Sequence, residues 1–433
     1  MAEELGGVLL AVFLRFFIVK MGVEFYGKKD IVNSSEKLYQ ALSALGKPFH
    51  IYADVKTLEA RALQQFMDVM QHEAIVQGAL MPDAHTGYTL PIGGVVASKG
   101  MIFPSFVGYD IGCGMIAVPT TYSMEEIDTP EMKSWVFKQI YRDVPVGFNH
   151  RKHEEPWDYS DLEYTKIIKY LIEDKKALSQ LGTLGGGNHF IEIGHDEHGS
   201  IWIVIHSGSR NLGYRTAEHY MKEAHPEKKS WEGVYGFDAN SNPGKEYIAD
   251  MNFALEFALE NRVRMIQYME ASFKRFLSGK ILWKEMINRN HNHAEPDKAG
   301  RWIHRKGATH AEEGMLGVVP GNMRDGSFIV KGKGNPQSMS SSSHGAGRIK
   351  SRTQAEKDIK LEDFKRIMQE AGVMAKVNPR TIDESPGVYK CIFTVMGMQK
   401  DLVEVLQHVK PLINVKADEE SSWGKKGRKK KSR

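Results

Sequence analysis

The sequence predicts an α+β protein, because strand-like and helix-like segments both recur along the 433-residue chain. Short apolar runs typical of buried strands stand at Gly94–Ala97, Met115–Val118 and Ile201–Ile205. Apolar residues recur at helical spacing in residues 57–77, in Asp161–Leu178 and in Glu246–Leu277. With 41% hydrophobic and 26% charged residues, the composition is that of a globular protein able to bury a full core. The length fits two or three domains, or one large unit.

The two ends of the chain differ in character from its body. Residues 8–19 are apolar apart from Arg15, but they are too few to span a membrane. We expect residues 1–20 to be an N-terminal appendage, with a membrane-surface anchor as the alternative. Residues 222–244 are polar and rich in turn formers, which predicts an exposed loop. The last segment, 418–433, is predicted to be a disordered basic tail that is solvated, directs nuclear entry or contacts RNA loosely.

Charge and cysteine content exclude some classes of protein. The formal net charge is +4, and seven of the basic residues lie between Lys425 and Arg433, which leaves −3 for the rest of the chain. The protein is therefore not a globally basic nucleic-acid binder, and an anionic polymer must be held by local patches or by the tail. The two cysteines, Cys113 and Cys391, are too few for a disulfide framework. We expect a reduced, cytoplasmic location; one long-range disulfide is the alternative.

The stretch Val107–Met115, VGYDIGCGM, places a carboxylate and a thiol three residues apart among glycines. Glycine permits a sharp turn, so Asp110 and Cys113 are expected to point toward one spot. An ionised thiol beside a carboxylate repels it unless a cation lies between them, and both groups are metal ligands. The alternative is a structural turn around a buried free thiol.

Five further segments carry histidines, acids and arginines in loops or at strand ends. They are Met81–Gly87 (a predicted loop with Asp83 and His85), Gly182–Glu192, Ile201–Arg210, Asn290–His293 and Ser340–Arg348 with Arg352 following. One histidine at a strand end is usually a core residue, but several beside Asp110 and Cys113 favour a shared metal site. Zinc, manganese and iron all accept such ligands, and a pair of ions bridged by Cys113 would suit phosphoryl chemistry. Arg210, Arg348, Arg352 and Lys306 suit phosphate.

This pattern predicts a metal-dependent phosphoryl- or nucleotidyl-transfer enzyme. A neutral imidazole near metals and arginines can attack phosphorus and form a covalent intermediate. The residues alone leave open which histidine binds metal and which is the nucleophile.

The chain resembles the RtcB family of RNA-splicing ligases from about Met81 to Lys416. The resemblance rests on an ordered series of motifs: MPDAHTGYTLPIGG, VGYDIGCGM, PVGFNHR, LGTLGGGNHFIE, HSGSRNLG, HNHAE, HRKGAT, VVPGNM, SSSSHGAGR with Arg352, and DESPGVYK. It implies one catalytic domain over residues 21–417, with β-sheets around a central metal and nucleotide cleft flanked by long helices.

The resemblance also implies an activity. Family members depend on Mn²⁺ and GTP and join an RNA 3′-phosphate, or a 2′,3′-cyclic phosphate after hydrolysis, to a 5′-hydroxyl in tRNA splicing or RNA repair. GTP guanylylates a histidine, GMP passes to the RNA 3′-phosphate, and the 5′-hydroxyl then displaces GMP. An archease-type activating protein is a further implied partner.

Residue roles follow from the same resemblance. His344 would be the nucleophile, and two Mn²⁺ ions would be held by Asp110, Cys113 and His189 and by Cys113, His206 and His291. The guanylate pocket would use Asn188, His189, Phe190, Ile191, Glu192, His291, Asn292, Pro320, Gly321, Asn322, Met323, Ser327, His344, Gly345, Ala346, Gly347, Tyr389 and Lys416. Asp83 would lie near the reacting ends, and Arg210, Arg348 and Arg352 would contact RNA or triphosphate oxygens.

Two departures from the family pattern bear on these roles. The family's small Gly-Ser-Met-Gly turn is replaced here by Gly321-Asn322-Met323-Arg324, where Arg324 would either crowd or strengthen the pocket. The family commonly ends at Lys-Gly, whereas sixteen residues follow Ala417 here, so the Lys416 contact is the weakest inference. The alternatives are a metal-dependent phosphoesterase that processes RNA ends with weak guanylylation, and a non-catalytic RNA-binding relative.

Overall fold

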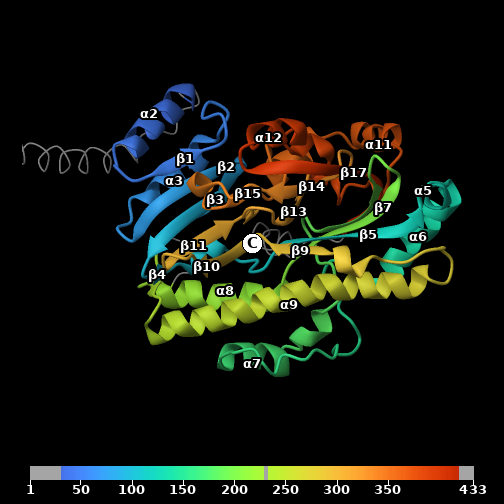
Figure 1. The fold of residues 1–433 in the computed structure, drawn as a ribbon, viewed down its shortest axis with the longest axis horizontal. Helices are drawn as coiled ribbons and strands as arrows, with labels where there is room; N and C mark the ends of the chain where they lie inside the picture. The colour runs from blue at the N-terminus through green and yellow to red at the C-terminus, as the bar shows by residue number, and fades with distance from the viewer. Residues whose placement is uncertain (1–30, 229–232, 419–433) are drawn as a thin grey trace, which may run out of the picture.

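The structure, a computed structural model, describes residues 31–228 and 233–418. The predicted appendage (1–20) and all but the first residue of the predicted basic tail (418–433) lie outside these residues. The α+β prediction is confirmed: two large sheets lie side by side, and helices cover them on both sides (Figure 1). In the described part of the chain, no helix is both long and apolar enough to span a membrane.

The first sheet has five strands in the order β1-β2-β3-β11-β10. Its members are β1 (Phe49–Ile51), β2 (Ile75–Tyr88), β3 (Leu90–Lys99), β11 (Arg301–Lys306) and β10 (Asn292–Pro296). Helices α2 (Ile31–Ser43) and α3 (Ala60–Met70) lie on its outer side (Figure 1). The buried side of α3, which includes Leu63, Phe66 and Met70, packs in one apolar cluster with Leu80 and Val96 of the sheet.

The second large sheet follows the order β13-β14-β17-β6-β7-β5-β9, with β16 added beside β17. Its strands are β5 (Gly114–Ser123), β6 (Phe190–His195), β7 (Ser200–Ser207), β9 (Ile287–Asn290), β13 (Leu316–Pro320), β14 (Ser327–Gly332), β16 (Met374–Ala375) and β17 (Val403–Val415). Two small pairs complete the pairing: β4 (Met101–Ile102) with β8 (Phe237–Asp238), and β12 (Ala308–His310) with β15 (Ser341–Ser343).

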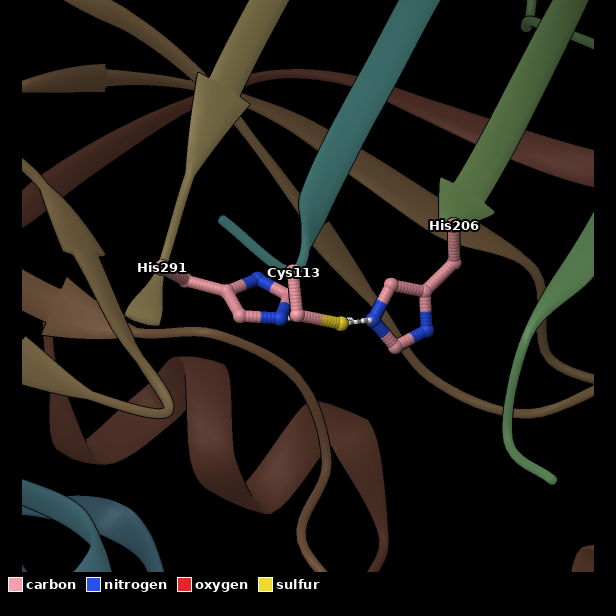
Figure 2. A group of neighbouring side chains, drawn as sticks. All are labelled: Cys113, His206 and His291. Carbon is pink, nitrogen blue, oxygen red and sulfur yellow. Dashed lines mark hydrogen bonds between the residues drawn. The ribbon is translucent and has the colours of Figure 1, made fainter. Parts of the chain in front are cut away.

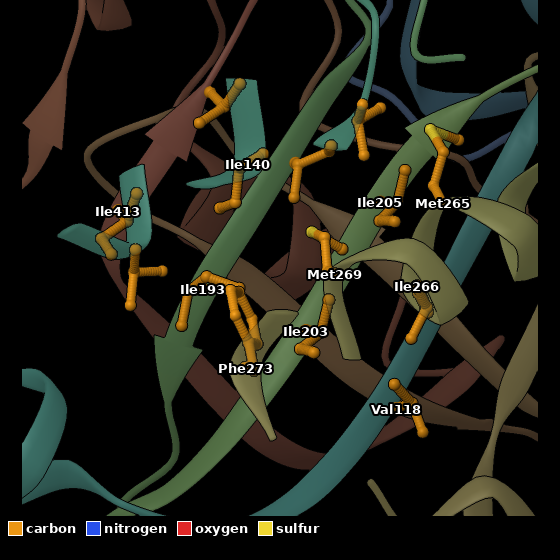
Figure 3. Close-up of a cluster of buried hydrophobic side chains, with 14 of the residues drawn as sticks. Val118, Ile140, Ile193, Ile203, Ile205, Met265, Ile266, Met269, Phe273 and Ile413 are labelled. Atoms are coloured by element: carbon orange, nitrogen blue, oxygen red, sulfur yellow. The ribbon is translucent and has the colours of Figure 1, made fainter. Parts of the chain in front are cut away.

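The 32-residue helix α9 (Asn242–Phe273) runs beneath both sheets, beside α8 (Arg210–Ala224) (Figure 1). Ser241 caps its start, where the side chain accepts a hydrogen bond from the amide of Gly244. Met265, Met269 and Phe273 face the isoleucines of β6 and β7 in a shared core (Figure 3). The apolar residues predicted at helical spacing in this segment therefore form part of the core.

The remaining helices are short. They are α4 (Pro104–Val107), α5 (Met124–Ile127), α6 (Pro130–Asp143), α7 (Lys166–Glu173), α10 (Arg352–Asp358), α11 (Leu361–Glu370) and α12 (Ile392–Met398). The helix predicted over Asp161–Leu178 is thus only eight residues long. Within 222–244, the described residues are largely irregular, as predicted, although Phe237 and Ala239 are buried.

One local prediction was wrong. The segment Met81–Gly87, expected to be a loop because of Pro82 and Gly87, belongs to the 14-residue strand β2. The pairing of β2 with β3 shifts register between Leu80 and His85 and again between His85 and Tyr88. An irregular strand tolerates Pro and Gly at such breaks, so residues typical of a loop occur here within a sheet.

Candidate metal and nucleotide site

Both cysteines are free, so the Cys113 thiol is available as a ligand. Asp110 and Cys113 lie in the turn between α4 and β5. Gly112 holds that turn with a φ of +74°, a left-handed conformation that favours glycine. A Cβ at Gly112 would lie 2.8 Å from the Cβ of Ala258 on α9, so the turn packs directly on the helix.

Strand ends from the second sheet bring the histidines to this turn. Cys113 immediately precedes β5, His206 is the penultimate residue of β7, and His291 follows β9. Strands β7 and β9 both pair with β5, so their ends meet beside Cys113. Figure 2 shows the Cys113 thiol directed at the His206 ring, with the His291 ring on its other side.

The distances define two overlapping groups that share Cys113. The thiol sulfur lies 3.2 Å from Nε2 of His206 and 3.4 Å from Nε2 of His189. Nε2 of His206 is 3.3 Å from Nε2 of His291, and Nε2 of His189 is 3.1 Å from Oδ2 of Asp110. Both triplets predicted from the sequence therefore converge, with ligand atoms within 4.8 Å of one another.

The donor chemistry of these groups fits metal ions. Nδ1 of His189 lies 3.0 Å from the carbonyl of Leu184, and Nδ1 of His206 lies 3.3 Å from the carbonyl of Asn188. A carbonyl only accepts, so each Nδ1 carries the proton and each Nε2 turns a lone pair toward Cys113. Burial lowers the pKa of His206 and of His291 well below the ordinary value, which keeps both rings neutral.

A third group of possible ligands already has a cation. His293, Glu295 and His310 lie close together, but the guanidinium of Arg305 is 3.1 Å from Nε2 of His293 and also pairs with Glu295. This buried arginine supplies the positive charge that a metal would bring.

His344 lies next to the cluster, directly after β15. Its ring centroid is 4.8 Å from that of His291. Its Nδ1 is 2.7 Å from Oδ2 of Asp83, which also accepts hydrogen bonds from the amides of His344 and Gly345. Burial alone would raise the pKa of Asp83, but His344 and Lys390 lower it below its ordinary value. Asp83 is thus an anion that holds Nδ1–H of His344 and leaves Nε2 available.

Hydrogen bonds and close packing join several of the residues predicted for the nucleotide. Lys416 is buried; its ammonium donates to the carbonyl of Asn188 at 3.2 Å and pairs with Glu384 at 2.9 Å. The Tyr389 hydroxyl donates to the same carboxylate at 2.5 Å.

Two further predicted residues lie in other contacts. Asn292 accepts from the amide of Gly307 and donates to the carbonyl of Asp110. A Cβ at Gly345 would lie 3.2 Å from the carbonyl of Pro320, which places the 320–323 turn against the HGAGR segment.

Glu192, another predicted pocket residue, links three strands. It accepts hydrogen bonds from Ser327 on β14 at 3.1 Å and from Asn414 on β17 at 3.2 Å. Burial raises its pKa to about 7, although these hydrogen bonds and Lys416 favour the charged form.

Arg324, in the turn that departs from the family pattern, pairs with its neighbour Asp325. The two contacts are 2.7 Å and 2.9 Å long, and the side chain is 47% exposed. The side-chain amide of Asn322 donates a hydrogen bond to the same Asp325 carboxylate. The guanidinium is therefore engaged at the surface by its neighbour.

The predicted arginines divide into two kinds. Arg210 starts α8 with a φ of +59° and reaches over Gly185, where a Cβ would lie 2.0 Å from its Nη1. Backbone strain of this kind clusters at functional sites. The Arg210 guanidinium donates to Thr183 and to the carbonyl of Gly147, so its hydrogen-bond partners among the described residues are neutral. Arg348, in contrast, pairs with the carboxylate of Glu384 and donates to the carbonyl of Asp383, while Arg352 is half exposed and pairs with Asp383 at 3.3 Å.

Sequence reasoning missed three residues of this network. Glu384 joins Lys416, Arg348 and Tyr389; Lys390 donates to the carbonyls of Pro82 and Ala84; and Arg262 of α9 supports the metal turn. Glu384 and Lys390 lie inside the quoted DESPGVYK motif, which was the available signal. No sequence signal pointed to Arg262, because nothing distinguishes it from the other basic residues of a long helix.

The fold and site define a class: an α+β protein with a cluster of possible metal ligands that share the Cys113 thiol, beside a histidine held by a buried carboxylate. The family model described as tRNA-splicing ligase RtcB matches residues 65–173 and 171–417. The RNA-splicing ligase RtcB of Escherichia coli strain K12 is 34% identical over 87% of this chain and 99% of its own length. The tRNA-splicing ligases RtcB of Thermococcus kodakarensis and Nanoarchaeum equitans are 26% and 27% identical, over 84% and 82% of this chain and 94% and 92% of their own lengths. The chain belongs to the RtcB family.

Proposed function

We propose that the protein is a Mn²⁺- and GTP-dependent RNA ligase that joins 3′-phosphate or 2′,3′-cyclic phosphate ends to 5′-hydroxyl ends. The observation that supports it most is the contact of His344 with Asp83 beside the His291 ring. This arrangement places an imidazole oriented by a carboxylate beside a cluster of possible metal ligands. Neither a structural histidine nor a plain RNA-binding surface needs both features.

Asp110, Cys113, His189, His206 and His291 would hold the two Mn²⁺ ions. Bound ions supply positive charge that offsets the charge of the triphosphate and of departing pyrophosphate. Backbone carbonyls accept from Nδ1 of His189 and of His206, which leaves Nε2 of each ring free to bind a metal ion.

His344 would act as the nucleophile. Its Nε2 lone pair would form a bond to the α-phosphorus of GTP while the bond to pyrophosphate breaks; the proton stays on Nδ1 and remains hydrogen-bonded to the Asp83 carboxylate, whose negative charge offsets the charge gained by the ring. An oxygen of the RNA 3′-phosphate then takes the guanylyl group, and the electron pair returns to Nε2. The 5′-hydroxyl oxygen attacks the activated phosphate, loses its proton, and GMP leaves.

The surrounding network would orient the nucleotide. Tyr389 offers a ring for the guanine, and Glu384 fixes both that ring's hydroxyl and Lys416. Arg348 serves as a positioning residue, since its guanidinium is bound to Glu384. Arg210 and Arg352 are the better candidates for RNA phosphates.

The test is a joining assay with purified full-length protein, GTP, Mn²⁺ and two RNA strands, one ending in a cyclic phosphate and one starting with a 5′-hydroxyl. We expect a joined product that needs both GTP and Mn²⁺. An opened cyclic phosphate without joining, and without need for GTP, would contradict the ligase and favour the phosphoesterase. The archease-type partner, the cytoplasmic location and nuclear entry through the tail stay predictions.

A further inference from the structure

Three tyrosines form a continuous aromatic surface beside the site, which we call the tyrosine surface. Tyr88 ends β2, Tyr109 precedes Asp110, and Tyr214 lies on α8. The rings of Tyr109 and Tyr214 stack with centroids 5.1 Å apart and planes 21° apart. Tyr88 meets Tyr109 edge to face at 6.0 Å and is 57% exposed. The surface therefore presents the Tyr88 ring to solvent, while the rings of Tyr109 and Tyr214 are partly buried.

The tyrosine surface adjoins the reacting groups. Tyr109 is covalently next to the candidate metal ligand Asp110. The ammonium of Lys306 donates to the carbonyls of Tyr88 and Ser105. The next residue, Gly307, lies against the His344 ring, since a Cβ there would be 3.0 Å from Cε1 of that ring and 2.4 Å from Cγ2 of Ile92. Short connections thus lead from the tyrosine surface to a predicted metal ligand and to the predicted nucleophile.

The structure holds Tyr88 in place at a cost in conformational energy. Thr89, which follows it, has a φ of +56°, a left-handed conformation that is a true outlier for a β-branched residue. Lys306, which binds the Tyr88 carbonyl, is 6% exposed, so its ammonium is withdrawn from water. Strained or desolvated groups persist where the surroundings fix them, and they cluster at functional sites.

Core packing does not account for the arrangement. Tyr109 packs partly against one apolar core cluster, but among the described residues neither Tyr88 nor Tyr214 belongs to any such cluster. Arg215 adds a guanidinium 5.9 Å from the centroid of the Tyr214 ring. Arg210, a candidate phosphate contact, lies four residues before Tyr214, at the start of α8.

We propose that the tyrosine surface binds unpaired nucleobases at the end of an RNA strand that enters the site. This inference rests on the proposed function and extends it. Aromatic rings stack on any base, while the strand's phosphates pass Arg210 and Arg215 toward the metal ligands. Such stacking is tolerant of sequence, because every base offers an aromatic face.

The test measures binding of two short, fluorescent single-stranded RNAs by anisotropy, one with a 5′-hydroxyl end and one with a 3′-phosphate end. Tyr88→Ala and Tyr214→Ala should each raise the Kd for at least one strand about 10-fold, as loss of a stacked base predicts. Tyr88→Phe and Tyr214→Phe should bind as tightly as the unchanged protein, because the ring remains. Tyr170→Ala, on the 46% exposed tyrosine of α7, is the matched control.

A second arm uses RNA with abasic positions at the two terminal nucleotides. The unchanged protein should bind it about as weakly as the alanine variants bind ordinary RNA. If the alanine variants lose affinity for only one of the two strands, the proposal is supported and that strand is the one bound by the tyrosine surface. Unchanged Kd values for both strands in both alanine variants, with thermal unfolding showing intact folds, would overturn it, as would full affinity for abasic RNA.

Formation of a GMP adduct by the unchanged protein separates this proposal from the proposed function. If no adduct forms and no RNA is joined, yet the alanine variants lose RNA affinity, then the ligase proposal fails and the tyrosine surface stands. If the adduct forms and RNA is joined while the alanine variants bind normally, only the tyrosine surface is refuted.

Discussion

The Cys113 thiol lies where its charged form is unfavourable unless a cation is bound. Burial raises its pKa well above the ordinary value and Asp110 raises it further, while Arg262 acts in the opposite direction. A metal ion reverses this balance because it binds the thiolate directly. The residue shared by both ligand groups is therefore the one whose chemistry depends most on metal.

Replacing Cys113 should remove metal from the site. Cys113→Ser keeps the size of the side chain but weakens the shared ligand, so we expect loss of at least one of the two Mn²⁺ ions per chain. Metal content after dialysis against Mn²⁺ and desalting measures this. The control is Cys391→Ser, since Cys391 is exposed and free. Equal metal content in Cys113→Ser and the unchanged protein would refute the shared-ligand assignment.

Asp83 should matter for guanylylation through the His344 ring. In Asp83→Asn the amide no longer offers a charged acceptor to Nδ1–H and to both backbone amides, so the ring loses its orientation. We expect GMP-adduct formation from labelled GTP to slow by about 100-fold or more. Metal content and thermal unfolding, measured on the same sample, show whether the site and fold survive. A rate within a few-fold of the unchanged protein would show that Asp83 has no such role.

At the scale of elements, α9 supports the metal site through one residue. Arg262 is fully buried, and its guanidinium donates to the carbonyls of Gly112 and Ser207 and to the side chains of Asn288 and Asn290. These partners lie beside Cys113, His206 and His291. Burial lowers the pKa of Arg262 to about 10, which still leaves it charged at neutral pH. One helix residue thus ties together the three strand ends that carry ligands.

Arg262→Met should loosen these strand ends without emptying the space. We expect Mn²⁺ affinity to fall about 10- to 100-fold, the usual effect of losing groups that orient metal ligands. Titration of the apo-protein with Mn²⁺ measures this. Arg264→Met is the matched control, because Arg264 lies on the same helix and pairs with Glu260 outside the site. Equal losses of Mn²⁺ affinity in the two variants would show that Arg262 has no special role at the metal site.

For the whole molecule, Glu192 makes stability depend on pH. Its folded pKa of about 7 lies above its ordinary value of 4.5. Between these values the unfolded chain releases its proton while the folded protein keeps it, so stability falls as pH rises through this window. The difference between the two pKa values corresponds to a loss of about 3 kcal/mol in the free energy of unfolding once the pH is above 7.

Glu192→Gln should remove this dependence. The free energy of unfolding, from urea titrations at pH 5 and pH 8, should decline less in the variant than in the unchanged protein. The neutral amide still accepts from Ser327, and Asn414 has an unbonded Oδ1 that accepts from the new amide if its side chain rotates. Glu197→Gln, in the exposed turn after β6, is the control. An identical decline in Glu192→Gln would contradict the raised pKa.

The sequence predicted what depends on local pattern and left out what depends on long-range contact. The α+β class, helix α9 and strand β7 follow from apolar spacing. The turn holding Asp110 and Cys113 follows from its glycines. The strand around Asp83 was missed because Pro82 and Gly87 signal a loop unless neighbouring β3 is known. Arg262 was missed because its partners lie up to 150 residues away in the chain. Glu384 stood inside a quoted motif, but its charged partners Arg348 and Lys416 lie 36 and 32 residues away.

The most direct test of the account maps the covalent GMP adduct by mass spectrometry after incubation with GTP and Mn²⁺. The account predicts the adduct on Nε2 of His344 and none in His344→Ala, while His198→Ala, an exposed histidine outside the site, is labelled normally. Metal content should be the same in all three proteins. An adduct on another residue, or full labelling of His344→Ala, would contradict the account.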